Sequence, residues 1–241
     1  MLTIVIASAG LLSPPVMSPV IESYPSKPMR NGQSAAALIE VVVDPRGKPV
    51  NCKTLTVFGN ETLGNDICKL QGRAKYKPAL TEAGEPTYGI IRAFIKYILP
   101  AFEQGREINR FEAPGITFQI VGAAVAVSTR VLRLNKALGQ PGARHIVVSP
   151  DVTFDVQSLP GVDGNFRDER VTVAVDSSGK VTHCTAPSQP EADATVSSYA
   201  IAACQQLEGM EISDPLMIDK QPVGYVRPLE VRFAIATPSG G

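Results

Sequence analysis

The fold is decided by a stretch that the chain contains twice: IEVVVDPRGKPVNC at residues 39–52 and VTVAVDSSGKVTHC at residues 171–184. The copies lie 132 residues apart (171 − 39), and six of their fourteen aligned positions are identical, including the aspartate, glycine, lysine and cysteine. A second cysteine follows each copy, and from there the offset is 136 (204 − 68). Such self-similarity indicates a repeated structural unit. We therefore expect two copies of one fold.

Each copy begins with an expected hairpin. Apolar residues alternate along the first strand, which is typical of a strand with one buried face; they are Ile39, Val41 and Val43 in the first copy and Val171, Val173 and Val175 in the second. The Asp-x-x-Gly-Lys sequence then predicts a turn in which Gly47 and Gly179 take a positive φ and Asp44 and Asp176 bond to their own turn backbone. Turn chemistry therefore explains both aspartates without a catalytic role.

A second strand, a helix and a closing strand complete each unit. The second strands are expected at residues 49–57 and 181–186, and the helices carry apolar stripes: Leu63, Ile67 and Leu70 in the first copy and Val196, Ala200, Ala203 and Leu207 in the second. Asn60 and Asp193 are the candidate helix N-caps. The fold class is therefore α+β: two tandem β-β-α-β units, each an antiparallel sheet with one helix packed on a face.

The closing strands also alternate. Residues 87–99 bury Ala93, Ile95, Tyr97 and Leu99 and turn Arg92, Phe94 and Lys96 outward; the second copy buries Leu229, Val231, Phe233 and Ile235 and turns Glu230 and Arg232 outward. Pro228 lacks a backbone N–H group, which predicts that the second closing strand lies at a sheet edge or a bulge.

Composition excludes several classes of protein. The 241 residues carry 23 basic and 23 acidic side chains with no block of like charge, so neither a nucleic-acid surface nor a polybasic membrane patch is expected. Residues 1–20 form an uncharged leader with Ala7-Ser8-Ala9 as a cleavage box, typical of a signal segment, although no basic residue precedes it. Prolines 14, 15 and 19 argue against a spanning helix.

Four cysteines lie two and two at matching points of the repeat. Neither their spacing nor the two histidines, His145 and His183, fit a zinc site, so no metal or other cofactor is expected. Cys68 and Cys204 are expected beside the apolar stripe of each helix, on the face turned to the sheet, which predicts the strand-to-helix disulfides Cys52–Cys68 and Cys184–Cys204. These bonds persist in an oxidising compartment, so we expect a periplasmic or secreted protein. Four buried thiols are the alternative.

The expected domain boundaries follow the repeat. After the leader, residues 21–100 form the first domain, with a proline-marked extended entry at residues 22–28, and residues 151–241 form the second, divergent domain. Residues 101–150 contain a polar linker and extra strands, with alternation at Ile116, Phe118 and Ile120, and a stretch at residues 125–138 that fits neither helix nor strand periodicity. Val152, Phe154 and Val156 alternate again and predict a strand that extends the second domain.

The chain resembles the TonB C-terminal domain family. The resemblance covers residues 24–99 and, more weakly, 160–235. Its motifs are Tyr24-Pro25, Asp44-x-x-Gly47, the helix at residues 63–70, Tyr76-Lys-Pro78-Ala79 and Gly84-Glu-Pro86. The second copy has Leu159-Pro160 in place of the Tyr-Pro entry and Asp214-Pro215 in place of the Pro78 element. The chain also departs from the family in its tandem arrangement, in its paired cysteines and in having neither a convincing transmembrane helix nor a proline-rich rod, which suggests a soluble relative.

The resemblance implies a non-enzymatic periplasmic binding or adaptor protein. Such domains receive a peptide, here a segment of an outer-membrane transporter, as an added strand at a sheet edge. The expected partner-binding residues are Arg92, Phe94, Lys96, Glu230 and Arg232, although the same residues would serve equally as a solvated face that protects the edge.

Two alternatives stay open. One is a structural envelope protein that self-associates through its sheet edges. The other is a secreted enzyme, against which the sequence lacks a nucleophile motif, a glycine-rich phosphate loop and a catalytic partner for either histidine. His183 beside Cys184 is Asn51 in the first copy, and there is no Cys-x-x-Cys pair, so a redox role is not predicted.

Overall fold

The structure is a computed structural model, and it describes residues 11–17, 25–31, 33–72, 74–97, 101–103, 106–108, 132–134, 144–146, 150–186 and 197–236. The helices are α1 (Ser26–Arg30), α2 (Glu61–Gln71) and α3 (Ser198–Leu207). The strands are β1 (Val16–Met17), β2 (Ala35–Val43), β3 (Pro49–Gly59), β4 (Tyr76–Lys77), β5 (Ala79–Leu80), β6 (Pro86–Tyr97), β7 (Ala101–Glu103), β8 (Arg106–Ile108), β9 (Leu132–Leu134), β10 (Arg144–Ile146), β11 (Val152–Val156), β12 (Phe166–Val175), β13 (Val181–Thr185), β14 (Leu216–Ile218), β15 (Gln221–Val223) and β16 (Tyr225–Ile235). Strands predominate, and the predicted α+β class is confirmed.

The chain divides into two compact units, which we name after the repeat copies. The first-copy unit consists of Val16–Lys77 and Ile91–Val148, and the second-copy unit consists of Met1–Pro15, Pro78–Ile90 and Ser149–Gly241. The segment Pro78–Ile90 thus belongs to the first copy in sequence but to the second-copy unit in space, because β5 and the start of β6 pack there. The compact units are therefore not identical to the sequence repeats.

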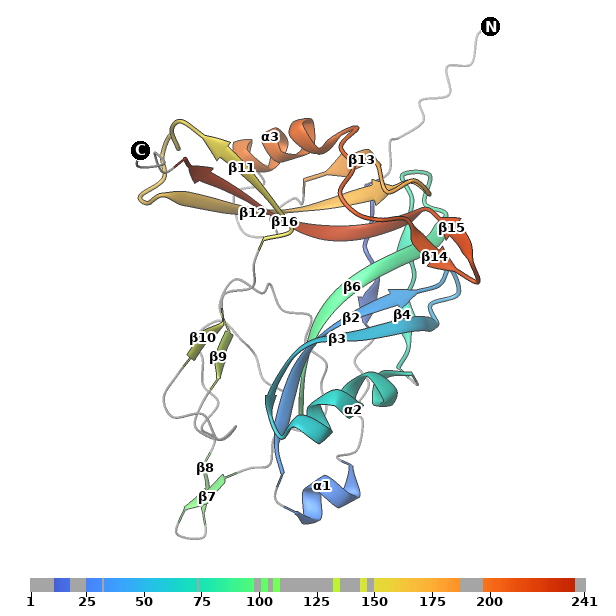
Figure 1. Cartoon of the computed structure of the whole chain (residues 1–241), viewed down its shortest axis with the longest axis vertical. Coiled ribbons are helices and arrows are strands. Elements are labelled where there is room, and N and C mark those ends of the chain that lie inside the picture. The colour runs from blue at the N-terminus through green and yellow to red at the C-terminus, as the bar shows by residue number, and fades with distance from the viewer. Residues whose placement is uncertain are drawn as a thin grey trace, which may run out of the picture. The chain divides into compact units, whose positions relative to one another are not determined.

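In the first-copy unit, β2 is the central strand. It pairs antiparallel with β3 along its length and also neighbours β6, while α2 packs against β2 and β3 (Figure 1). The predicted N-cap is confirmed, since the Leu63 N–H donates to the Asn60 side-chain oxygen at 2.9 Å. The short strands β1 and β4 pair with each other, as do β7 with β8 and β9 with β10.

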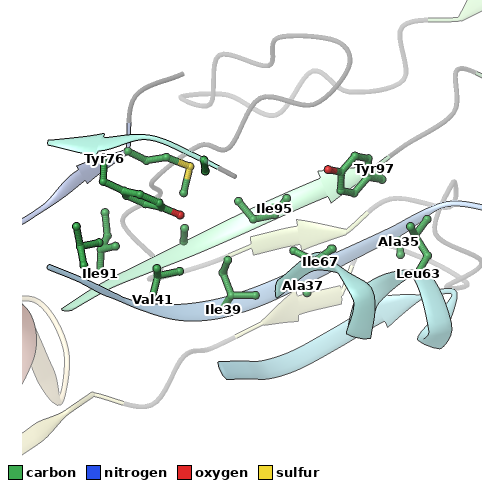
Figure 2. Close-up of a cluster of buried hydrophobic side chains, with 14 residues drawn as sticks. Ala35, Ala37, Ile39, Val41, Leu63, Ile67, Tyr76, Ile91, Ile95 and Tyr97 are labelled. Carbon is green, nitrogen blue, oxygen red and sulfur yellow. The ribbon is translucent and has the colours of Figure 1, made fainter. Parts of the chain in front are cut away.

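The core of this unit lies between the strands and α2. Figure 2 shows Ile39 and Val41 of β2, Ile91 and Ile95 of β6 and Ile67 of α2 gathered in one cluster. All five are buried, as alternation predicted for Ile39, Val41 and Ile95 and the helical stripe for Ile67. The prediction of a single buried face was wrong for β2, because its opposite face is buried as well, at Ala36, Leu38 and Val42. The disulfide Cys52–Cys68 joins β3 to α2 beside this cluster and confirms the predicted pairing.

In the second-copy unit, β12 and β16 pair antiparallel over ten residues, and β13 continues the sheet on the far side of β12. The helix α3 packs against β12 and β13, and Cys184–Cys204 ties it to β13, again as predicted. On the other side of β16, β11 runs parallel to its C-terminal half, and Tyr88 and Gly89 of β6 run parallel to its first residues. The predicted apolar face is buried at Leu229, Val231 and Phe233, but Ile235, which was also predicted to be buried, is 38% exposed at the end of the strand.

The predicted hairpin turns are present in both copies. Gly47 has φ 79° and Gly179 has φ 92°. The Asp44 carboxylate accepts the N–H groups of Arg46 and Lys48 at 2.9 and 2.8 Å. Asp176 accepts the equivalent N–H groups at 2.8 and 3.1 Å and the Ser178 hydroxyl at 2.6 Å, and these hydrogen bonds, led by that of the Ser178 side chain, lower the pKa of Asp176. Both aspartates are turn residues.

One prediction about the second closing strand was wrong. β16 is an interior strand, with β12 on one side and parts of β6 and β11 on the other. Pro228 is tolerated because both backbone groups of Glu230 point toward Asp151, away from β12. Alternate residues of a strand share this direction, so the Pro228 nitrogen also points away from β12 and removes no hydrogen bond from that ladder.

Two smaller predictions also failed. Residues 26–30 form α1 rather than an extended entry, and Pro28 lies within the first turn, where its missing N–H removes no helical hydrogen bond. The cap of α3 is Ser197, which makes no side-chain cap hydrogen bond, because its hydroxyl donates instead to Glu169 at 3.0 Å. The proposed cap Asp193 and the stripe residue Val196 lie outside the described residues.

Part of the segment assigned to the leader is folded. Leu12 and Met17 are buried, and Ser13 exchanges two backbone hydrogen bonds with Leu80, at 3.1 and 2.8 Å. The proposed cleavage box at residues 7–9 lies outside the described residues, as do Tyr24 and the alternating residues Ile116, Phe118 and Ile120. The ambiguous stretch at residues 125–138 contains the strand β9.

Candidate functional site: the closing strands and their edges

The predicted binding residues of the first copy lie on β6. Arg92 donates to the Glu40 carboxylate on the neighbouring strand β2 at 3.0 Å, and its side chain is 26% exposed. Its charge is therefore used, at least in part, to hold β6 to β2. The backbones of Phe94 and Lys96 belong to β6, but their side chains lie outside the described part of the structure.

The predicted binding residues of the second copy form cross-strand ion pairs with β12. Arg232 lies opposite Asp168 and binds it through two nitrogens, at 2.7 and 3.0 Å, and Glu230 lies opposite Arg170 at 3.7 Å. The hydrogen bond to Asp168 raises the pKa of Arg232. The Arg232 guanidinium also covers the Phe166 ring, 4.2 Å from its centre. These contacts stabilise the sheet, and a partner-binding role for both residues stays a prediction.

Sequence reasoning missed the residue that seats β11 beside β16. The Asp151 carboxylate accepts the Glu230 backbone N–H at 2.9 Å and the Arg227 guanidinium at 3.2 Å, and the Asp151 N–H donates to the Glu230 carbonyl at 2.8 Å. The alternation at residues 152–156 correctly predicted a strand that extends the second copy. A lone aspartate before a strand gave no signal of this clamp, because the partners lie 76 and 79 residues later.

The outer strands differ in how they are protected against pairing with another chain. In β3, the register with β2 shifts twice, so that Val50 and Leu55 form bulges, and Pro49 and the exposed Lys53 add further obstacles. In β13, Val181 already exchanges two hydrogen bonds with residues 209–210, each at 2.9 Å. In β6, no second strand within the described residues pairs with residues 93–96 on the side away from β2.

The described residues offer little for metal or nucleophile chemistry. They contain no group of three or more His, Cys, Asp or Glu side chains that could hold a metal ion, and all four cysteines are in disulfides. His183 lies 3.3 Å from Glu82, and both side chains are exposed. A mostly apolar hollow of about 330 Å³ in the second-copy unit is lined by Leu11, Leu12, Pro14, Thr172 and Pro228, among others.

No helix within the described ranges has the length and apolar character to cross a membrane. Comparison of the chain with protein-family models, with curated proteins and with solved structures found no match.

Proposed function

We propose that the chain is a non-enzymatic adaptor protein of the bacterial cell envelope, built from two tandem β-β-α-β units of the TonB C-terminal type. It binds an extended peptide of a protein partner, such as a segment of an outer-membrane transporter, by β-strand addition. In this proposal the first-copy unit presents the receiving edge, and it lies on β6.

The disulfides support an extracytoplasmic location. Each bond joins a strand to a helix. Together the two bonds use all four cysteines, so no free thiol is left for redox chemistry. Bonds of this kind persist in the periplasm or outside the cell and are rare in the cytosol. The disulfides therefore support an extracytoplasmic location, and the family resemblance is the reason for proposing the periplasm in particular.

The observation that carries the proposal is the contrast between the outer strands of the first-copy unit. β3 has two bulges, a proline and an exposed lysine, which are the devices by which proteins prevent edge pairing. Residues 93–96 of β6 have no second strand among those described, and the sequence places Phe94 and Lys96 there. Added strands gain affinity from backbone hydrogen bonds and specificity from alternate side chains.

The test is capture from a detergent-solubilised envelope on the purified, disulfide-bonded chain. We expect recovery of outer-membrane transporters or their N-terminal peptides, and a severalfold loss with the double substitution Phe94→Ser/Lys96→Glu. Lys53→Glu on β3 is the matched control, because it changes the charge of the other outer strand, and capture should be unchanged. Circular dichroism of each variant establishes that the fold is retained.

Two outcomes would contradict the proposal. A loss with Lys53→Glu but not with the β6 variant would move the receiving edge to β3. Recovery of the chain itself alone, with dimers in analytical ultracentrifugation, would favour the alternative of a self-associating envelope protein.

A further inference from the structure

The strand β11 is attached to the second-copy unit in an unusual way. It runs parallel to β16, with Val152 opposite Val231 and Val156 opposite Ile235. Phe154 lies opposite Phe233, and their ring centres are 5.7 Å apart. Just after the end of β16, the Ala236 N–H donates to the carbonyl of Val156, the last residue of β11, at 3.3 Å. Within the described residues, β16 is the only strand that pairs with β11.

Backbone pairing and the Asp151 clamp hold β11, rather than burial in the core. None of its five residues is buried, whereas the three core-facing valines of β12 are at most 2% exposed. Parallel pairing is slightly weaker per residue than antiparallel pairing. A strand with few buried apolar contacts and one neighbour belongs to the part of a protein that opens at low free energy.

We propose that the side of β16 from Leu229 to Ile235 is a strand-receiving site, that β11 fills it from within the same chain, and that another strand can replace β11. The replacing strand is a peptide that runs parallel to β16, with apolar residues at alternate positions and a carboxylate immediately before them. Its aromatic residue at the centre packs on Phe233, and its carboxylate binds Arg227 and the Glu230 N–H, as Asp151 does.

This inference deepens the proposed function and rests on it, since it names the peptide that a sheet edge of this chain selects. It also gives the two copies different roles. In this proposal β11 occupies the edge of β16, and a partner binds there only when β11 has left. The apparent affinity for the partner is therefore the intrinsic affinity multiplied by the fraction of molecules in which the site is open.

Hydrogen exchange of the full chain tests whether β11 leaves. We expect the amides of residues 152–156 to exchange at least tenfold faster than the amides of β12 that bond to β16. Equal protection of β11 and β12 would mean that β11 opens only with the whole unit, which would overturn the proposal.

Binding of a labelled peptide tests whether the site accepts another strand. The probe is a fluorescent peptide of residues 150–157, PDVTFDVQ. The substitution Asp151→Asn in the chain removes the charged hydrogen bonds that help to hold β11 on β16, while the peptide keeps its own aspartate. The peptide should therefore bind this variant about tenfold more tightly than it binds the wild-type chain. A scrambled peptide should not bind.

A covalent lock separates release of β11 from general destabilisation. Asp155 and Ala234 lie opposite each other in the register, so Asp155→Cys/Ala234→Cys should join β11 to β16 in the Asp151→Asn background. We expect the locked chain to lose peptide binding and the matched Asp155→Ser/Ala234→Ser chain to keep it. Binding that survives the lock, or no binding to the unlocked variant while circular dichroism stays native, would overturn the proposal. Envelope capture through β6 is a separate readout, so failure here leaves the proposed function standing.

Discussion

The two copies share their scaffold and differ along their closing strands. Each has an Asp-x-x-Gly turn with a positive-φ glycine, a hairpin, and a helix joined to the second strand by a disulfide. In the first-copy unit, β6 has β2 as its neighbour, while in the second-copy unit β16 lies between β12 and β11. The repeated residues thus build the scaffold, and the residues that differ decide which strands pair at the edge.

The ion pairs follow the same division. Arg92 of β6 pairs with Glu40 of β2, and Arg232 of β16 pairs with Asp168 of β12, so each closing strand is bound to the first strand of its own hairpin. Among the described residues, a charged clamp on the opposite side is seen in the second copy, between Asp151 and Arg227. We conclude that the second copy uses additional charges to recruit one more strand.

Removal of a disulfide, the element that the copies share most closely, should destabilise the chain most. Replacing Cys52 and Cys68 by alanine removes a crosslink over 16 residues, and replacing Cys184 and Cys204 removes one over 20. Loop-closure entropy predicts a loss of about 3 kcal/mol in each case. Urea unfolding followed by circular dichroism measures each loss.

Near-equal losses would show that the two crosslinks act mainly on the unfolded chain. A much larger loss in one copy would contradict that view and would indicate that its disulfide holds a strand-helix contact that packing alone does not maintain. The reduced wild-type chain is the control for both double variants.

Sequence reasoning succeeded where the cause is local. Alternation correctly placed one face of β2 and of β16 in the core, although it did not reveal that the opposite face of β2 is buried too, and the turn residues correctly predicted positive φ at Gly47 and Gly179. The Asn60 cap was also predicted correctly, because a cap bonds within its own first turn.

Sequence reasoning failed where the cause is distant in the chain. Pro228 indicated an edge strand, yet β11 and Asp151, which precede it by 72 to 77 residues, cover that side of β16. Glu169 diverts Ser197 from capping α3 across 28 residues. Neither contact leaves a periodic or spacing signal, so only the folded chain reveals the partners.

Two positive-φ glycines from different turns, Gly179 of the second copy and Gly84 of the first, differ in the space around them. Gly179 has φ 92°, and a Cβ there would overlap the carbonyl oxygen of Ser213, whereas Gly84 of the other copy has φ 76° and open space around it. Gly84→Ala should therefore lower the free energy of unfolding only by the left-handed backbone penalty, about 1–2 kcal/mol. Gly179→Ala should lower it by more, because Ser213 must also be displaced. The difference between the urea midpoints of the two variants measures the destabilisation caused by the contact with Ser213. Equal losses of stability in the two variants would contradict crowding at Ser213.

A smaller change in stability is expected at the turn that precedes each closing strand. The offset of 136 aligns Lys220 with Gly84, and Lys220 has φ 66° where Gly84 has φ 76°. The second copy thus carries a strained lysine where the first has a glycine. Lys220→Gly should stabilise the second-copy unit by about 0.5–1 kcal/mol, since relief of the backbone penalty exceeds the added entropy of glycine in the unfolded chain.

Lys220→Ala is the matched control for that change, because alanine removes the charge but keeps the Cβ that makes a positive φ unfavourable. We expect its urea midpoint to equal that of the wild-type chain. If alanine stabilised as much as glycine, the charge of Lys220 rather than its backbone would be the source of the strain. In that case the difference between the two turns would be electrostatic, and the glycine of the first copy would not be required by its conformation.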